Sequence, residues 1–196
     1  MKKRYLIALA ACAFILAGCL VTSVYPFYTA KDVVFEPAIT GSWTNSSDAQ
    51  EHWAFEVKET NHYQLTYANK DSTNVMQATL FKLHGNLFMD LFNPEIKDDV
   101  QPPPIPVHFV MRMTQIKPTI KMAPMNYDWL VKLLDENPKA LRHHLIGEEK
   151  DKDKNRLVLT ADTPELQAFL VKHLGTAEAW KDESELVRED GNGKEK

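Results

Sequence analysis

Short segments in which apolar and polar residues alternate follow one another from about residue 41. In His52–Lys58, Trp53, Phe55 and Val57 are separated by mostly polar residues, and Tyr63–Tyr67 alternates in the same way. A period of two residues is typical of antiparallel strands with one buried face. We therefore predict a strand that begins near residue 41 and further strands near residues 52–58, 63–67, 75–83, 87–92, 107–113, 119–122, 144–146 and 156–160.

Two later segments have the spacing of amphipathic helices. The pattern predicts one helix over residues 126–136, capped by Asn126, and a second over residues 163–174, capped by Thr163 and ended by Gly175. Their apolar faces are formed by Trp129, Leu130, Leu133 and Leu134 in the first helix, and by Leu166, Phe169, Leu170 and Leu174 in the second.

The fold class that follows is mainly β within an α+β arrangement. About seven to nine short strands joined by hairpin turns, with two late helices, predict an antiparallel meander that closes or nearly closes into a barrel. Gly41-Ser42-Trp43, near the start of the first strand, resembles the G-x-W of lipocalins and related calycins. The resemblance implies a calycin-like barrel. The same three residues would also be expected if Trp43 were simply an aromatic core residue at the start of a β domain. A β-sandwich therefore remains an alternative to the barrel.

The first 19 residues have the order of charge and hydrophobicity of an export signal. Lys2, Lys3 and Arg4 precede an apolar run that is shorter than the roughly 20 residues of a membrane-spanning helix. The run ends in Leu16-Ala17-Gly18-Cys19, which resembles the lipobox of bacterial lipoproteins. Cys12 ends a competing match, but cleavage there would leave a very short apolar region and an apolar mature N-terminus.

The lipobox resemblance implies where the mature protein is held. Residues 1–18 would be removed as a signal peptide, and Cys19 would carry a diacylglycerol that attaches the protein to a membrane of the cell envelope. Leu20 follows the cysteine, whereas an Asp at this position favours the inner membrane in proteobacterial lipoproteins. In a host with two membranes, the resemblance therefore favours the outer membrane.

The rest of the chain divides into three parts. Residues 19–40 form a lipidated N-terminus and an unusually apolar tether, residues 41–181 form one β-rich domain, and residues 182–196 are polar and expected to be disordered. The apolar tether either packs on the domain or places its aromatic residues at the lipid interface. We predict that Tyr25, Phe27 and Tyr28 form a ligand surface together with methionine-bearing strands.

Composition limits the kinds of partner. The net charge of −4 becomes −7 without the three cationic residues of the signal, which argues against nucleic acid as a partner. The two cysteines of the chain are Cys12, within the signal, and Cys19, in the lipobox, so the mature domain has no thiol for a disulfide or a zinc site.

Motifs that mark common catalytic or metal sites are absent from the sequence. The seven histidines lack metal-ligand spacing, and there is no H-E-x-x-H, G-x-S-x-G or phosphate-binding glycine loop. Asp151–Asn155 begins like an EF-hand loop, but Arg156 stands where the turn needs glycine. We predict no catalytic residue, no cofactor and no metal ion, and Cys19 is the single site residue, as the point of lipidation.

Methionines are numerous for one β domain and fall on several predicted strands, namely Met76, Met89, Met111, Met113, Met122 and Met125. Methionine fills irregular cores, which is the favoured interpretation, and it also lines adaptable apolar pockets. The leading hypothesis is a membrane-anchored, non-enzymatic domain that binds a ligand or interacts with an envelope protein. A carrier of a lipid or small apolar ligand, and a hydrolase with an unrecognised site, are the alternatives.

Overall fold

The computed structural model describes residues 20–59, 61–93, 106–146 and 156–189. The predicted signal peptide with Cys12, Cys19, most of the proline-rich connector at 102–106, the EF-hand-like loop at 151–155 and the last seven residues lie outside these ranges. The structural statements below concern the described residues.

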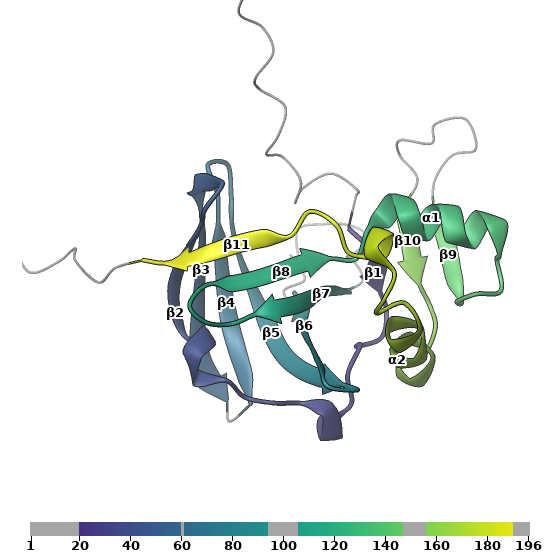
Figure 1. Cartoon of the computed structure of the whole chain (residues 1–196), viewed down its shortest axis with the longest axis horizontal. Helices are drawn as coiled ribbons and strands as arrows, with labels where there is room; N and C mark the ends of the chain where they lie inside the picture. Colours follow the sequence, from purple (N-terminus) through teal and green to yellow (C-terminus); the bar gives the residue numbers. More distant parts are fainter. Residues whose placement is uncertain (1–19, 60, 94–105, 147–155, 190–196) are drawn as a thin grey trace, which may run out of the picture.

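Eight antiparallel strands form a closed barrel (Figure 1). They follow the order β6-β5-β4-β3-β2-β11-β8-β7, and the pairing of β6 with β7 closes the ring. The strands are β2 Gly41–Asn45, β3 Asp48–Glu59, β4 His62–Ala68, β5 Thr73–Leu83, β6 Asn86–Phe92, β7 His108–Gln115, β8 Ile120–Pro124 and β11 Ser184–Arg188. The predicted fold class, a mainly β calycin-like barrel with two late helices, is confirmed.

A smaller sheet extends from β7 on one side of the barrel. β1 (Thr22–Ser23) pairs with β7 and, in parallel, with β10 (Arg156–Leu159), which in turn pairs with β9 (His143–Ile146). The helices α1 (Tyr127–Glu136) and α2 (Thr163–Lys172) lie beside this extension (Figure 1). Short 3-10 turns, η1 (Ala30–Asp32), η2 (Pro37–Ile39) and η4 (Ala177–Ala179), complete the described elements.

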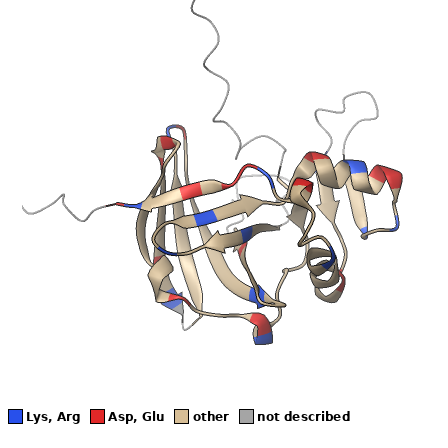
Figure 2. Cartoon of the chain, viewed as in Figure 1, with Lys and Arg blue, Asp and Glu red and all other residues tan. Residues whose placement is uncertain are grey.

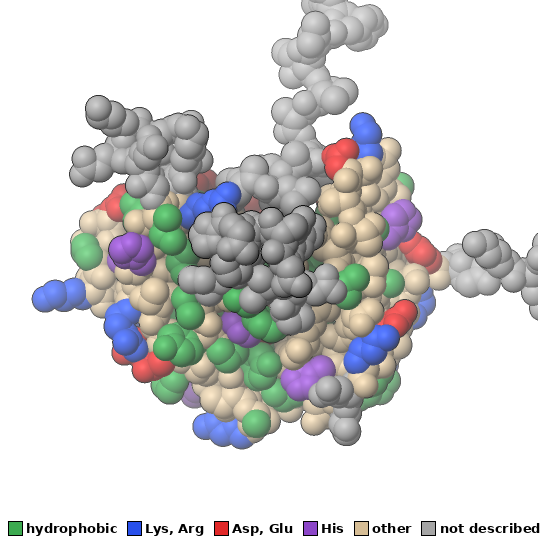
Figure 3. All heavy atoms as spheres, turned by 180° about the vertical axis from the view of Figure 1, so that it is seen from behind, with side chains coloured by type: hydrophobic (Ala, Val, Ile, Leu, Met, Phe, Trp, Pro, Cys, Tyr) green, Lys and Arg blue, Asp and Glu red, His purple; other side chains and the backbone are tan. Residues whose placement is uncertain are grey.

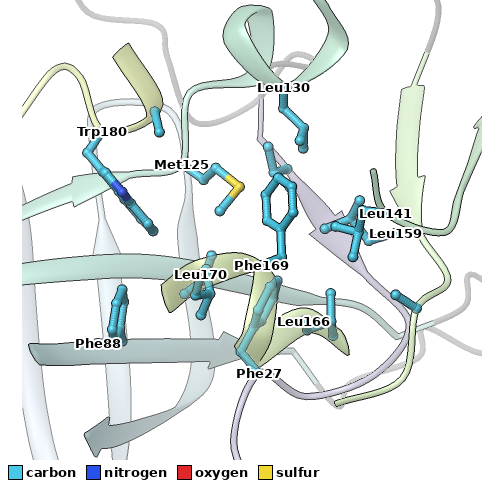
Figure 4. Packing of buried hydrophobic residues seen from close by; sticks show 14 of the residues in the cluster. Phe27, Phe88, Met125, Leu130, Leu141, Leu159, Leu166, Phe169, Leu170 and Trp180 are labelled. Atoms are coloured by element: carbon cyan, nitrogen blue, oxygen red, sulfur yellow. The ribbon is translucent and has the colours of Figure 1, made fainter. Parts of the chain in front are cut away.

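The barrel wall separates two hydrophobic cores. One fills the barrel interior, and the other lies between the outer faces of β5 to β8 and the two helices. In the outer core, Phe27 meets Leu166 and Phe169 of α2, while Phe88 of β6 lies near Trp180 (Figure 4). Strands β5 and β6 are therefore buried on both faces, which explains their continuous apolar runs.

The helix boundaries agree with the prediction at the start of α1 and differ in α2. Asn126 caps α1 by accepting a hydrogen bond from the Trp129 N–H at 3.1 Å. The cap of α2 is Asp162, whose carboxylate accepts from the Glu165 N–H, so the prediction of Thr163 was wrong. The Thr163 hydroxyl instead donates to the Pro26 carbonyl at 2.7 Å, and it ties the N-terminal segment to α2.

The expectation of a disordered tail over 182–196 was wrong for residues 184–188. These residues form β11, which pairs with β2 on one side and β8 on the other, and so completes the barrel. Leu186 is the one buried side chain of this strand. Because hydrogen bonds to two neighbouring strands hold it in place, β11 needs little hydrophobic patterning of its own.

One end of the barrel is closed by η2 and by a contact between its first and last strands. The Trp43 indole N–H donates to the Ile39 carbonyl at 2.8 Å, and the Arg188 guanidinium lies 4.3 Å from the centre of the Trp43 ring. Arg188 also donates to the carbonyls of Ala38 and Thr40. We call this the capped end of the barrel.

Replacing Gly41 at the capped end with alanine should destabilise the fold. Gly41 has a φ of +123°, and a Cβ atom there would lie 2.5 Å from Arg188 Nη1. We expect Gly41→Ala to lower the free energy of unfolding by about 1–3 kcal/mol in urea denaturation. Gly175→Ala is the matched control, because no atom lies within 4 Å of its added Cβ. Equal effects of the two changes would contradict this account of the capped end.

Candidate functional site

The end of the barrel opposite η2 carries the most polar part of its interior. We call it the distal end, and it lies where β2 turns into β3 and where β4 connects to β5 (Figure 1). Three aromatic residues form a row across neighbouring strands of the barrel interior. Trp43, Trp53 and Tyr67 stand opposite one another on β2, β3 and β4, and all three are buried. The Trp53 and Tyr67 rings meet edge to face at 4.9 Å.

Glu51 is the centre of a hydrogen-bonded cluster at the distal end. One carboxylate oxygen accepts from the Asn45 amide at 2.7 Å, and the other accepts from the Tyr67 hydroxyl at 3.2 Å. The Asn69 amide in turn donates to the Tyr67 hydroxyl at 3.3 Å. The positions of Glu51 and Trp53 differ by two in β3, so both side chains lie on the same face of the strand.

Tyr67 has the most strongly shifted titration of this cluster. Burial raises the pKa of its hydroxyl to about 12, and the negative charge of Glu51 acts in the same direction. The hydrogen bond from Asn69 opposes both effects. Tyr67 is therefore a neutral hydrogen-bond donor throughout the physiological range.

Trp53 offers a hydrogen-bond donor that no described residue uses. Its side chain is 5% exposed, and its Nε1 atom is buried without a partner among the described residues. Buried N–H groups are nearly always paired, and leaving one unpaired costs about 1–3 kcal/mol. The indole N–H of Trp53 is thus a buried donor left over among the described residues.

Most of the methionines line the barrel opposite the aromatic strands. Met89 and Met122 are fully buried there, Met111 and Met113 nearly so, and Met76 is partly buried. Met125 belongs to the outer core instead. The barrel interior thus has an aromatic wall on β2 to β4 and a wall rich in methionine on β5 to β8.

The structure separates the aromatic residues of the N-terminal segment from those methionines. Phe27 is 1% exposed in the outer core, and Tyr28 is half-buried beside Phe81. Tyr25 is 48% exposed. Phe27 and Tyr28 pack on the outer face of the barrel wall, as expected if the tether packs on the domain, so the wall separates them from the methionines of the barrel interior. Hydrophobic side chains do gather on the face shown in Figure 3.

Asp90 forms a second polar group, outside the barrel, which the sequence analysis missed. Its buried carboxylate accepts from the Phe27 N–H at 3.0 Å, and its other oxygen lies 2.7 Å from Nδ1 of His108. Ser23 stands opposite His108 in the β1–β7 pairing, but it is fully buried. The bond between the Phe27 N–H and Asp90 ties the N-terminal segment to β6 of the barrel wall. The sequence signal for this polar group was Asp90 itself, an acidic residue within the apolar run of β6.

The remaining histidines do not gather around a common point. His143 and His144 are adjacent on β9, and Nδ1 of His143 lies 2.8 Å from the Leu141 carbonyl. His52 contacts Glu189, and His62 contacts Thr79. Within the described ranges, no group of three histidine, cysteine or acidic residues could hold a metal ion. Lysine and arginine residues are scattered among acidic ones over the described surface (Figure 2).

Comparisons with protein-family models, with curated proteins and with solved structures find no match to this chain. Among the described residues, no helix is both long enough and apolar enough to span a membrane. The interpretation of the distal end therefore depends on its geometry and chemistry.

Proposed function

We propose that this protein is a membrane-anchored binding protein, without enzymatic activity, that carries a small apolar ligand in its barrel. The observation that carries the proposal is the buried indole N–H of Trp53, which has no partner among the described residues and lies in a largely apolar interior. Binding sites for small ligands combine apolar walls with a few polar groups that fix orientation. The distal end has both features, since the Glu51 cluster lies next to the aromatic and methionine walls.

The chemistry of the distal end narrows the class of ligand. The Trp53 N–H requires an acceptor such as a carbonyl or hydroxyl oxygen. The Glu51 carboxylate disfavours an anionic headgroup, because two negative charges at short range repel each other. Methionine and aromatic side chains favour a flexible hydrocarbon body. A neutral lipid with an ester or hydroxyl group meets these three conditions.

The lipid anchor is the second part of the proposal. It is supported by Leu16-Ala17-Gly18-Cys19, by the cationic start of the chain and by the apolar run between them. Two or three acyl chains on Cys19 would hold the protein permanently at a membrane, since each buried methylene contributes about 0.8 kcal/mol. An envelope membrane, the outer one in a host with two, would then be the partner and the source of ligand.

Binding of a neutral lipid can be measured by displacement of a neutral apolar dye, N-phenyl-1-naphthylamine. We expect the dye to fluoresce with the protein, and monoolein, which has an ester carbonyl, to displace it. Trp53→Phe keeps an aromatic ring and removes the N–H, so monoolein affinity should fall about two- to tenfold. The affinity of hexadecane, which has no acceptor, should stay the same.

Trp129→Phe is the control for this measurement, since Trp129 lies on α1 and packs on the outer core. It should leave both affinities unchanged. An absence of dye fluorescence, or a monoolein affinity that Trp53→Phe does not alter, would count against a ligand at Trp53. Native mass spectrometry of protein purified from membranes provides an independent readout through a co-purified lipid.

A further inference from the structure

Two apolar side chains are exposed at the end of β9. Leu145 is 47% exposed and Ile146 is 53% exposed, and they are adjacent on the outermost strand of the small sheet. Because side chains alternate along a strand, they emerge on opposite faces of it. Together they give this strand end an apolar tip.

The register of the small sheet places this tip beside the start of the described chain. Ile146 stands opposite Arg156 in the β9–β10 pairing, and Thr22 stands beside Val158 in the parallel β1–β10 pairing. Neighbouring strands are about 4.8 Å apart, so β1 and β9 are separated by about 10 Å across the sheet, and Leu20 comes two residues before β1.

We propose that Leu145 and Ile146 lie in the lipid interface of the membrane that holds the anchor. This inference rests on lipidation of Cys19, as proposed above. Cys19 is joined directly to Leu20, and consecutive Cα atoms are about 3.8 Å apart. Acyl chains on Cys19 would therefore hold the bilayer surface at the side of the domain that carries the start of β1. The apolar tip of β9 lies on the same side and contacts the bilayer surface.

Two further features fit contact with a bilayer. Arg156, an exposed cation at the start of β10, stands opposite Ile146, where its guanidinium can approach lipid phosphates. The β2–β3 turn of the distal end faces the same side of the molecule as the start of β1 and the end of β9 (Figure 1). The proposed orientation thus turns the distal end toward the source of a lipid ligand.

Val57 provides a matched control position. It is 47% exposed, like Leu145, but it lies near the end of β3, on the side of the molecule opposite the start of β1 (Figure 1). A bilayer that contacts Ile146 would not contact Val57. A comparison of reporters at positions 146 and 57 therefore tests whether membrane contact depends on the location of the residue or only on its exposed apolar character.

The experiment places a fluorescent reporter at each position of the full, lipidated protein. The chain is expressed as Ile146→Cys or Val57→Cys, purified from membranes, labelled with an NBD dye on the introduced thiol, and reconstituted into phosphatidylcholine vesicles. With Cys19 lipidated and Cys12 removed with the signal, the introduced thiol is the single free one. Far-ultraviolet circular dichroism verifies that each labelled variant has the wild-type fold.

We expect the reporter at position 146 to emit at shorter wavelength on vesicles and to be quenched by doxyl-labelled lipid, at a depth of about 5–10 Å. The reporter at position 57 should show neither change. If the protein co-sediments with the vesicles and both reporters behave alike, the proposed contact is overturned while the anchor stands. If the protein does not co-sediment, the anchor itself fails, and the inference fails with it.

Discussion

Phe27→Ala should lower the free energy of unfolding of the mature protein by about 3–5 kcal/mol. The Phe27 ring is buried in the outer core among residues of α2 and the barrel wall (Figure 4). Removing it leaves a cavity in a region where β6, α2 and the N-terminal segment converge. Urea denaturation followed by circular dichroism measures the loss.

The effect of removing the Phe27 ring can be separated from the effect of its backbone hydrogen bonds. Its N–H donates to Asp90, and its carbonyl accepts from Gln167 Nε2 at 3.1 Å. Alanine keeps both bonds, so the expected loss comes from packing alone. Tyr25→Ala is the control, and it should change the stability by no more than about 0.5 kcal/mol because the Tyr25 side chain is half exposed. A loss below about 1 kcal/mol for Phe27→Ala would show that the N-terminal segment is not part of the core.

The alternation of residue types predicted the barrel strands well where one face is buried. In β4, buried and partly exposed residues alternate without exception along its seven residues. In β5 and β6, runs of four consecutive buried residues replace the alternation. These runs indicate strands that are buried on both faces of the sheet. They could have predicted that the helices pack on the outer faces of β5 and β6.

Other features of the fold could not be predicted from local sequence patterns, because they depend on contacts between segments that are distant in the sequence. β1 is two residues long, and β11 has one buried side chain, so pairing with neighbouring strands determines both. The cap of α2 depends on Thr163 being engaged by Pro26, 137 residues earlier. The distal end likewise needs the β2–β3 and β3–β4 registers, which bring Asn45, Glu51 and Tyr67 together.

The candidate site could be predicted from the sequence even less than these elements of the fold. The methionines and Trp43 could be assigned to a β core from the sequence, whereas the unpaired state of the Trp53 N–H follows from the packing around it. A tryptophan in an alternating strand is otherwise an ordinary core residue. The function proposed for the barrel therefore had no motif in the sequence, in contrast to the anchor, which has one.

Cys19→Ala should abolish lipid attachment completely. The thioether of a lipoprotein requires a thiol, and alanine at this position has none, so the precursor should stay uncut and carry no acyl chains. Metabolic labelling with a palmitate analogue, followed by intact mass measurement, tests both outcomes. Cys12→Ala is the matched control, and it should be labelled and cut like the wild type because Cys12 lies within the predicted signal. Labelling of Cys19→Ala, or loss of labelling in Cys12→Ala, would show that Cys19 is not the point of attachment.

The position of the proposed anchor matters because the described fold begins almost immediately after it. Leu20 forms a bridge with Asn126 at the start of α1, and Val21 is already buried in the outer core. A lipid on Cys19 would therefore hold the domain directly against the bilayer, without the flexible spacer that a polar tether provides. Inserting about ten Gly/Ser residues between Cys19 and Leu20 would lengthen the reach by several tens of ångströms and should leave labelling intact. If the tip of β9 binds the bilayer by itself, the NBD signal at position 146 should survive the insertion. If the short connection alone imposes the contact, the signal should weaken.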